Sequence, residues 1–245
     1  YNVVAVNTGS KLRLYINGVL IDEKSHSLDA TQDSNYMIGS TQRGSEYYDG
    51  QIDDVRYYNR ELNTLEVQQL YEWGSKGRDL RARTTTKNKS YLDGWWKLNE
   101  TSGSKAKDSS GNGNDASVFG AGPDDTGTSD SPVYSSAYDF DGTGDYVEIP
   151  NNNVLQPSNG PRFSISTWVR HDSVQDTQLY VIRSGDSGNK DYTGLLFNSG
   201  QNSFEGYILD DSVESNYSAH IYSDTSPQVD KWYHVVFTKD WNGSN

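Results

Sequence analysis

The feature that most constrains the fold of this chain is a series of short β-strand signals separated by turn-forming residues. Runs rich in Val, Ile, Tyr, Phe and Trp occur throughout residues 1–58 and 91–245, and clusters of Gly, Asn, Asp and Ser stand between them. Many short strands at close spacing are typical of antiparallel sandwiches. An aromatic content of 12% also supports a packed core. We therefore predict an all-β fold, an antiparallel β-sandwich of the jelly-roll type.

One hairpin and one helix are predicted from local signals. Leu12, Leu14 and Ile16 alternate with polar residues before Asn17-Gly18, the strongest short hairpin signal. A helix is expected from an N-cap at Asn63, with a capping box and a closing glycine. Its box partner is Glu66, its closing residue is Gly74, and its apolar stripe is Leu62, Leu65, Val67, Leu70 and Tyr71.

Composition excludes several classes of function. The net charge of −13 repels phosphate backbones, so we expect no nucleic-acid partner. The absence of cysteine excludes disulfides, thiolate metal sites and thiol nucleophiles. No apolar run approaches the 18 or so residues that a membrane-spanning helix needs, so we expect no membrane insertion.

The two ends of the chain resemble each other. Tyr233–Thr238 and Tyr1–Val6 share three identities in six positions, and each precedes a turn with Gly and Ser. Residues 75–90 contain six basic residues, one acidic residue and no aromatic residue, which predicts a linker. The chain thus has the length of one repeat of an array, with its ends in equivalent strands.

Several motifs resemble those of the laminin-G-like, concanavalin A-like jelly-roll modules. The first half of such a module matches the later part of this chain, and the second half matches the earlier part. The matching segments are Gly94–Leu98, Asp108–Asn114, Phe140–Ile149, Phe163–Val169 and Trp232–Val236 for the first half, and Leu12–Gly18, Ile38-Gly39 and Gly50–Leu62 for the second.

The order of these motifs implies two half-modules. Residues 1–74 resemble the C-terminal half of one module, and residues 91–245 resemble the N-terminal portion of the next. Neither half can bury its apolar strand faces alone, so we predict that they pack together as one permuted sandwich. Val3–Val6 and Val235–Thr238 then compete for one position in a sheet.

We expect no catalysis. Glucanases that share this general fold carry a strand with E-x-D-x-E, whose carboxylates lie on one face. The nearest run here, Gln51–Val55, has adjacent aspartates that a regular strand points to opposite faces. The four histidines lie in no Ser-His-Asp or H-E-x-x-H context.

Calcium is the one cofactor that the sequence suggests. Ile52 and Val55 both face the core only if a β-bulge lies at Asp53 and Asp54, and bulges recur beside functional sites. One of these carboxylates could bind calcium, or it could instead pair with Arg56 or with backbone N–H groups.

Two Asp-Gly loops are the other oxygen-rich places. Asp108 in the first loop, and Asp141 and Asp145 in the second, could bind calcium together with loop carbonyls. The same residue types are also ordinary turn formers.

Sugar binding is suggested by tyrosines in polar strands. Tyr192, Tyr217 and Tyr222 lie on strands rich in Ser, Asn and Asp, where an exposed ring can receive a sugar.

These observations predict a non-catalytic module of an extracellular or cell-surface protein. Its expected partners are a polysaccharide or glycoconjugate and the neighbouring modules of the same protein. Calcium is expected to have a structural role. The alternative is a structural or adhesive spacer, and a glycoside hydrolase is the third interpretation.

Overall fold

The computed structural model describes residues 10–26, 35–42, 45–77, 91–123, 131–134, 136–150, 162–173, 178–184, 192–210, 217–224 and 226–240. Its first part contains β1 (Ser10–Ile16), β2 (Val19–His26), β3 (Tyr36–Ile38), β4 (Ser40–Gln42), β5 (Ser45–Tyr47), β6 (Asp49–Tyr58) and α1 (Thr64–Gly74). Its second part contains β7 (Leu92–Trp96), β8 (Lys105–Ala106), β9 (Ala116–Phe119), β10 (Gly122–Pro123), β11 (Tyr138–Asp141), β12 (Tyr146–Ile149), β13 (Phe163–His171), β14 (Gln178–Ser184), β15 (Tyr192–Asn198), β16 (Ser203–Asp210), β17 (Tyr217–Tyr222) and β18 (Tyr233–Asp240).

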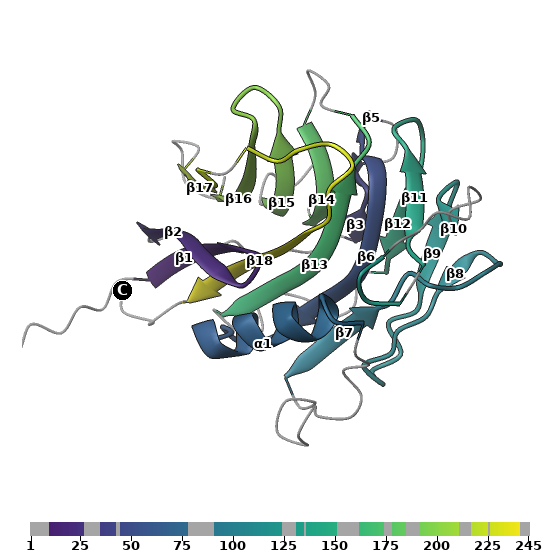
Figure 1. Ribbon diagram of the computed structural model, residues 1–245, viewed down its shortest axis with the longest axis horizontal. Helices are drawn as coiled ribbons and strands as arrows, with labels where there is room; N and C mark the ends of the chain where they lie inside the picture. Colours follow the sequence, from purple (N-terminus) through teal and green to yellow (C-terminus); the bar gives the residue numbers. More distant parts are fainter. Residues whose placement is uncertain are drawn as a thin grey trace, which may run out of the picture.

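Two antiparallel sheets form a sandwich (Figure 1). Sheet A has the strand order β10-β11-β6-β13-β18-β1-β2, and β7 also pairs with β6. Sheet B has the order β17-β16-β15-β14-β3-β12-β9-β8. The prediction of an all-β antiparallel sandwich with one helix is therefore confirmed for the described residues.

Both sheets contain strands from the early and the late parts of the sequence. In sheet A, β6 pairs with β13, β11 and β7, and β1 pairs with β18. In sheet B, β3 lies between β14 and β12. The predicted competitor of β18, Val3–Val6, lies outside the described residues, as does most of the predicted linker. Among the described strands, β18 occupies the position between β13 and β1.

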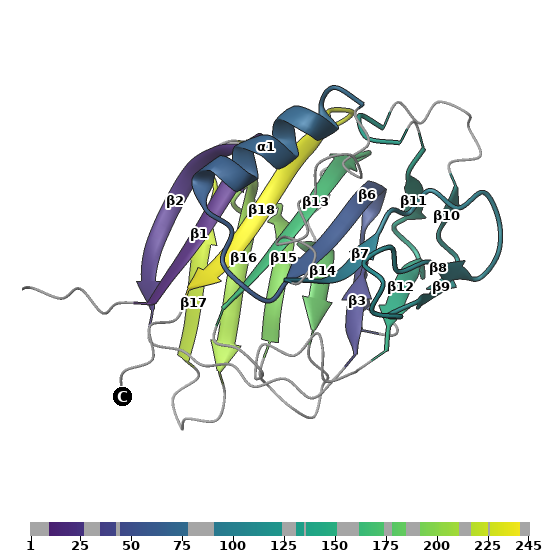
Figure 2. The same cartoon turned by 90° about the horizontal axis from the view of Figure 1, so that it is seen from below.

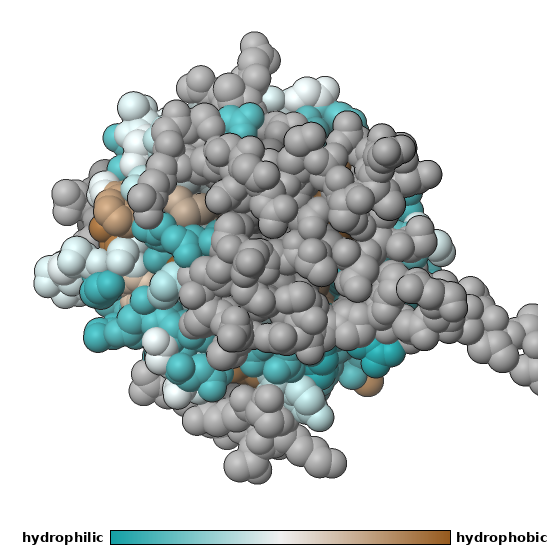
Figure 3. Space-filling model, turned by 180° about the vertical axis from the view of Figure 1, so that it is seen from behind, coloured by the Kyte–Doolittle hydropathy of each residue, from teal (hydrophilic) through white to brown (hydrophobic). Residues whose placement is uncertain are grey.

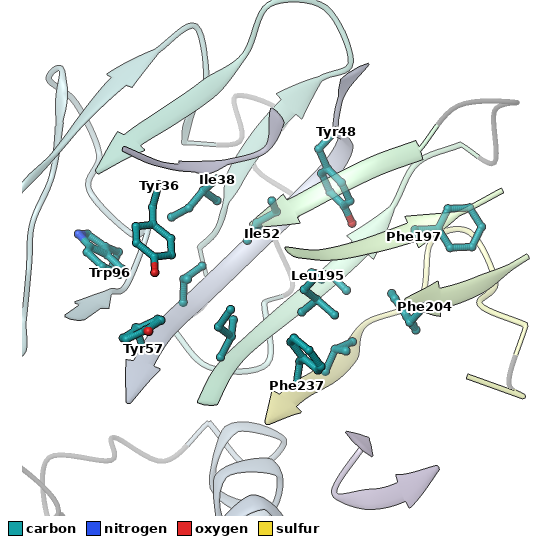
Figure 4. Packing of buried hydrophobic residues seen from close by; sticks show 14 of the residues in the cluster. Tyr36, Ile38, Tyr48, Ile52, Tyr57, Trp96, Leu195, Phe197, Phe204 and Phe237 are labelled. Atoms are coloured by element: carbon teal, nitrogen blue, oxygen red, sulfur yellow. The ribbon is translucent and has the colours of Figure 1, made fainter. Parts of the chain in front are cut away.

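The main core lies between the two sheets, where alternate residues of each strand meet (Figure 4). Sheet A contributes Ile52 and Phe237, and sheet B contributes Leu195, Phe197 and Phe204, all fully buried. This alternation leaves the intervening residues of sheet B on its outer face, away from the core. That outer face carries none of the described helices.

Helix α1 covers the outer face of sheet A (Figure 2). Val67 and Leu70 of the helix pack in one cluster with Tyr15, Trp95 and Val236 of the sheet. The outer faces of the two sheets are therefore not equivalent. Helix α1 covers that of sheet A, whereas no described helix lies on that of sheet B.

The helix begins as predicted, but two details differ. Asn63 is the N-cap, and its capping box with Glu66 is present. Leu65, expected in the buried stripe, is 69% exposed. Gly74 lies inside the helix, whose C-cap is Ser75. A side chain at Gly74 would collide with the Trp168 ring, so this glycine serves close packing and not chain reversal.

The predicted hairpin is confirmed at Asn17 and Gly18, which have φ angles of 50° and 79°. Both values are those that a type I′ turn requires. A side chain at Gly18 would press against Tyr71, so this turn also packs on α1. Across the described residues, no helix is long and apolar enough to cross a membrane.

Candidate functional site

Strand β6 has the predicted bulge, one residue along from the aspartate pair, because Asp54 and Val55 stand opposite the single residue Thr167. The register of β6 against β13 shifts at this point, and Asp54 has a φ of 54°. The carboxylate oxygen Oδ1 of Asp54 accepts hydrogen bonds from Arg56 Nε at 3.1 Å and Nη2 at 2.9 Å, and from Trp95 Nε1 at 2.8 Å. Asp54 thus forms the ion pair with Arg56 that the sequence analysis gave as the alternative to calcium binding.

Burial dominates the acidity of both aspartates. Asp53 is fully buried and accepts a hydrogen bond from the Ser131 hydroxyl. Burial raises the pKa of Asp53 well above its usual range, and the neighbouring Asp54 carboxylate raises it further. Burial also raises the pKa of Asp54, and Arg56 opposes this. These carboxyl groups lie in the interior, out of reach of a large substrate.

The Asp108 carboxylate organises its own loop. Its Oδ1 accepts from the backbone N–H groups of Trp95 at 3.1 Å and Ser110 at 2.8 Å. Its Oδ2 accepts from the Ser110 hydroxyl at 2.8 Å and from the backbone N–H of Asn114 at 2.9 Å. Four donors on one carboxylate match the turn interpretation of this loop.

The second Asp-Gly loop is more open. Asp141 Oδ1 accepts from the Thr143 backbone N–H at 2.7 Å, and Asp145 Oδ2 accepts from that of Asp141 at 3.1 Å. Asp141 is exposed, and it pairs in register with Asp49 of β6. Burial raises the pKa of Asp145, the backbone N–H of Asp141 lowers it, and the Asp141 carboxylate raises it. Of the predicted calcium ligands, these two are the least engaged by protein donors.

No metal-binding group of three acidic or histidine side chains is present in the part of the chain that the structure describes. Calcium binding therefore stays a prediction, with the loop of Asp141 and Asp145 as its best-fitting place.

The outer face of sheet B brings aromatic and polar side chains together on β16 and β17. Register places Tyr207 opposite His220, and Glu205 opposite Tyr222. The rings form a continuous stack. Centroids are 5.9 Å apart from Tyr207 to His220, with planes inclined by 16°, and 6.1 Å apart from His220 to Tyr222, with planes inclined by 8°.

A buried carboxylate holds this stack in place. Glu205 is only 2% exposed, and it accepts hydrogen bonds from Asn198 Nδ2 at 2.8 Å and from His220 Nδ1. Burial, followed by the Glu205 charge, raises the pKa of Tyr222. We name Asn198, Glu205, Tyr207, His220 and Tyr222 the tyrosine-histidine patch.

Only one of the three predicted ligand-binding tyrosines can be placed. Tyr222 is half-buried and belongs to the tyrosine-histidine patch. Tyr192 lies on β15 and Tyr217 on β17, but their side chains are outside what the structure describes. Sequence reasoning missed Glu205 and His220. The alternation of Glu205 with Tyr207, and of His220 with Tyr222, was the available signal, because alternate residues share a face.

Two packed antiparallel sheets with one helix are the fold of a concanavalin A-like module. A family model described as Laminin_G_3, of the concanavalin A-like lectin/glucanases superfamily, matches residues 1–68 and 141–245. Because the match covers well over half of the chain, the chain belongs to this family. The family is typically non-catalytic, although the superfamily includes glucanases. No curated protein and no solved structure matches the chain.

Proposed function

We propose that this chain is a non-catalytic carbohydrate-binding module of an extracellular or cell-surface protein. The ligand is a polysaccharide or glycoconjugate, and it binds on the outer face of sheet B. The observation that carries the proposal is the pair of half-buried rings of His220 and Tyr222, which the buried Tyr207 and Glu205 hold in place. Flat rings offer apolar contact to a sugar, and neighbouring polar groups bond its hydroxyls.

The arrangement of acidic groups also supports a binding role over hydrolysis. A glycosidase needs two carboxylates about 5–9 Å apart in a cleft. Within the tyrosine-histidine patch, Glu205 is the single carboxylate, and its two oxygens are engaged by Asn198 and His220. Asp53 and Asp54, the adjacent pair, lie in the interior.

Replacing Tyr222 by alanine is expected to weaken glycan binding roughly tenfold, since one ring of the stack is lost. The measurement is affinity electrophoresis through gels that contain starch, xylan, mixed-linkage β-glucan or mannan. Tyr222→Phe, which keeps the ring, should retain most of the affinity. Tyr91→Ala is the matched control, because Tyr91 is a 44% exposed tyrosine that directly precedes β7 of sheet A. If none of the polymers retards the wild-type chain, the spacer alternative replaces this proposal.

We further propose that residues 1–74 and 91–245 are halves of two consecutive modules in a tandem array. The interrupted family match and the pairing of β1 with β18 support this view. Neighbouring modules of the same protein are then its natural partners.

Structural calcium is part of the proposal and is tested by thermal melting. An ion bound only to the folded chain raises the melting temperature, and EDTA reverses the rise. Asp141→Asn is expected to abolish this response. Asp53→Asn is expected to keep it, because Asp53 is fully buried against Ser131. A melting temperature that neither calcium nor EDTA changes would show that the folded chain does not bind calcium.

A further inference from the structure

A second aromatic platform lies at the other end of the outer face of sheet B. Phe119 of β9 and Tyr146 of β12 stand opposite each other in register, and their rings stack at 4.6 Å with planes inclined by 19°. Val147 of β12 is fully buried in the core. Tyr146, its neighbour in the strand, therefore points to the outer face. Phe119 is 40% exposed, so the platform is accessible.

A polar pocket adjoins this platform. Its volume is about 260 Å³, and its walls are Asn35, Lys105, Asp115, Ser117, Glu148 and Pro150. Ser117 and Glu148 face each other across β9 and β12, two residues along from Phe119 and Tyr146. The platform and the pocket are therefore about 7 Å apart along the strands, at roughly 3.4 Å per residue. On the side where β8, β9 and β12 lie, the described surface is mostly hydrophilic and includes a small hydrophobic area (Figure 3).

The pocket groups hold one another in position. Glu148 Oε1 accepts from Asn35 Nδ2 at 2.6 Å, and Lys105 Nζ donates to the Ser117 hydroxyl at 2.9 Å. Asp115 accepts from the Asp108 backbone N–H through Oδ1 and from Lys107 through Oδ2, each at 2.9 Å. The pocket thus has fixed polar groups before any ligand arrives, and fixed groups lower the cost of binding.

The charged and polar side chains that line the pocket determine which class of ligand fits it. The two carboxylates of the pocket are balanced by Lys105 and by Lys107, which pairs with Asp115, so a charged ligand meets no net attraction. An apolar ligand would leave buried polar groups without partners. A neutral sugar has an apolar ring face for the platform, and its hydroxyls both donate and accept hydrogen bonds for the pocket.

We propose that Phe119, Tyr146 and this pocket form a second binding site for a neutral sugar residue. The inference rests on the proposed function, in which the outer face of sheet B binds glycans. Strands β3, β14 and β15 separate β12 from β16. The two sites are therefore about 19 Å apart, at roughly 4.8 Å per strand step. A long glycan reaches both sites and gains avidity, whereas a disaccharide occupies one.

The test compares Phe119→Ala with Leu65→Ala, an equally simple truncation of an exposed apolar residue on α1, at 69% exposure. Affinity electrophoresis with the four neutral polymers named above is one readout. Calorimetric stoichiometry with the matching disaccharides is the other. Phe119→Ala is expected to lower polymer affinity by on the order of tenfold or more. Disaccharide stoichiometry should fall from two per chain to one, with an unchanged melting temperature.

The outcomes separate the two proposals. If Tyr222→Ala weakens polymer binding while Phe119→Ala behaves like Leu65→Ala, the second site is wrong and the proposed function stands. If the wild-type chain binds none of the neutral polymers, the proposed function and the sugar assigned to this pocket both fall. Retardation by heparin that Phe119→Ala removes would show that the pocket takes anions, against the charge argument.

Discussion

Replacing Asp54 by alanine is expected to lower the free energy of unfolding by roughly 3–5 kcal/mol, because it leaves the buried Arg56 without its carboxylate. The two side chains are each 4% exposed, and two guanidinium nitrogens bond one oxygen of Asp54. Trp95 loses its indole acceptor in the same variant. Urea denaturation at pH 7 measures the loss.

A matched substitution one residue away separates this pairing from mere burial. Burial raises the pKa of Asp53 well above its usual range, so the fold disfavours its charged form, and a neutral amide removes that unfavourable burial of charge. Asp53→Asn is expected to leave stability at pH 7 unchanged or to increase it. Asp54→Asn, which keeps an acceptor and tolerates positive φ, should cost less than Asp54→Ala. Equal losses in Asp53→Asn and Asp54→Asn would contradict this account of the bulge.

The second large effect is expected in acid. His171 lies against the rings of Phe197 and Phe204, and His234 lies against that of Trp168. Burial lowers the pKa of His171 to about 4 and that of His234 to about 3, with Arg56 contributing to the latter. Their ordinary value is 6.5, so the unfolded chain takes up these protons first.

Proton linkage determines whether stability rises or falls with pH. Above pH 6.5 both imidazoles are neutral in either state, and their contribution to stability is complete. As the pH falls, the stability linked to His171 is lost by about pH 4, and that linked to His234 by about pH 3. The losses are about 3 and roughly 5 kcal/mol, since a tenfold change in proton affinity is worth about 1.4 kcal/mol.

A variant isolates this effect from the aspartates, whose raised pKa values act in the opposite direction. In His171→Phe, a non-titrating ring takes the place of the imidazole beside Phe197. The variant loses the contact between the His171 ring and the Tyr48 hydroxyl, so it starts less stable at pH 7. Relative to wild type, it is expected to gain about 3 kcal/mol between pH 7 and pH 4 in denaturant titrations. A difference that does not change with pH would show that His171 titrates normally.

Local signals predicted the elements that depend on neighbours in sequence. The turn at Asn17 and Gly18 and the N-cap at Asn63 are set by backbone geometry within four residues, and the structure contains both. A bulge at the aspartate pair was also predicted, because Ile52 and Val55 could not share a face without it, and the structure has it at Asp54 and Val55.

Features that depend on residues far apart in the sequence could not be predicted from local patterns. The exposure of Leu65 depends on which face α1 turns to sheet A, and the buried cluster shows that Val67 and Leu70 fill that face. The short strands β8 and β9 have too few residues for a recognisable alternation. Their pairing is defined only by the sheet that they join.

The candidate site shows the same division. Tyr222 was found because its strand is polar and aromatic, but its partners required the register of β16 against β17. Likewise, Phe119 and Tyr146 are 27 positions apart in sequence, and only the pairing of β9 with β12 brings their rings together. A sequence identifies candidate rings, whereas strand register decides which of them make a surface.

The pairing of β1 with β18 also determines how the sandwich bears tension. Lys11 at the start of β1 pairs with Asp240 at the end of β18, so the two strands enter and leave the sheet at the same end. The hydrogen bonds of an antiparallel pair run perpendicular to the strands. A pull that separates Lys11 from Asp240 therefore loads these bonds one after another, as in opening a zipper. A pull in this direction would part β1 from β18 at low force and would open the core first at Leu12, Leu14 and Phe237.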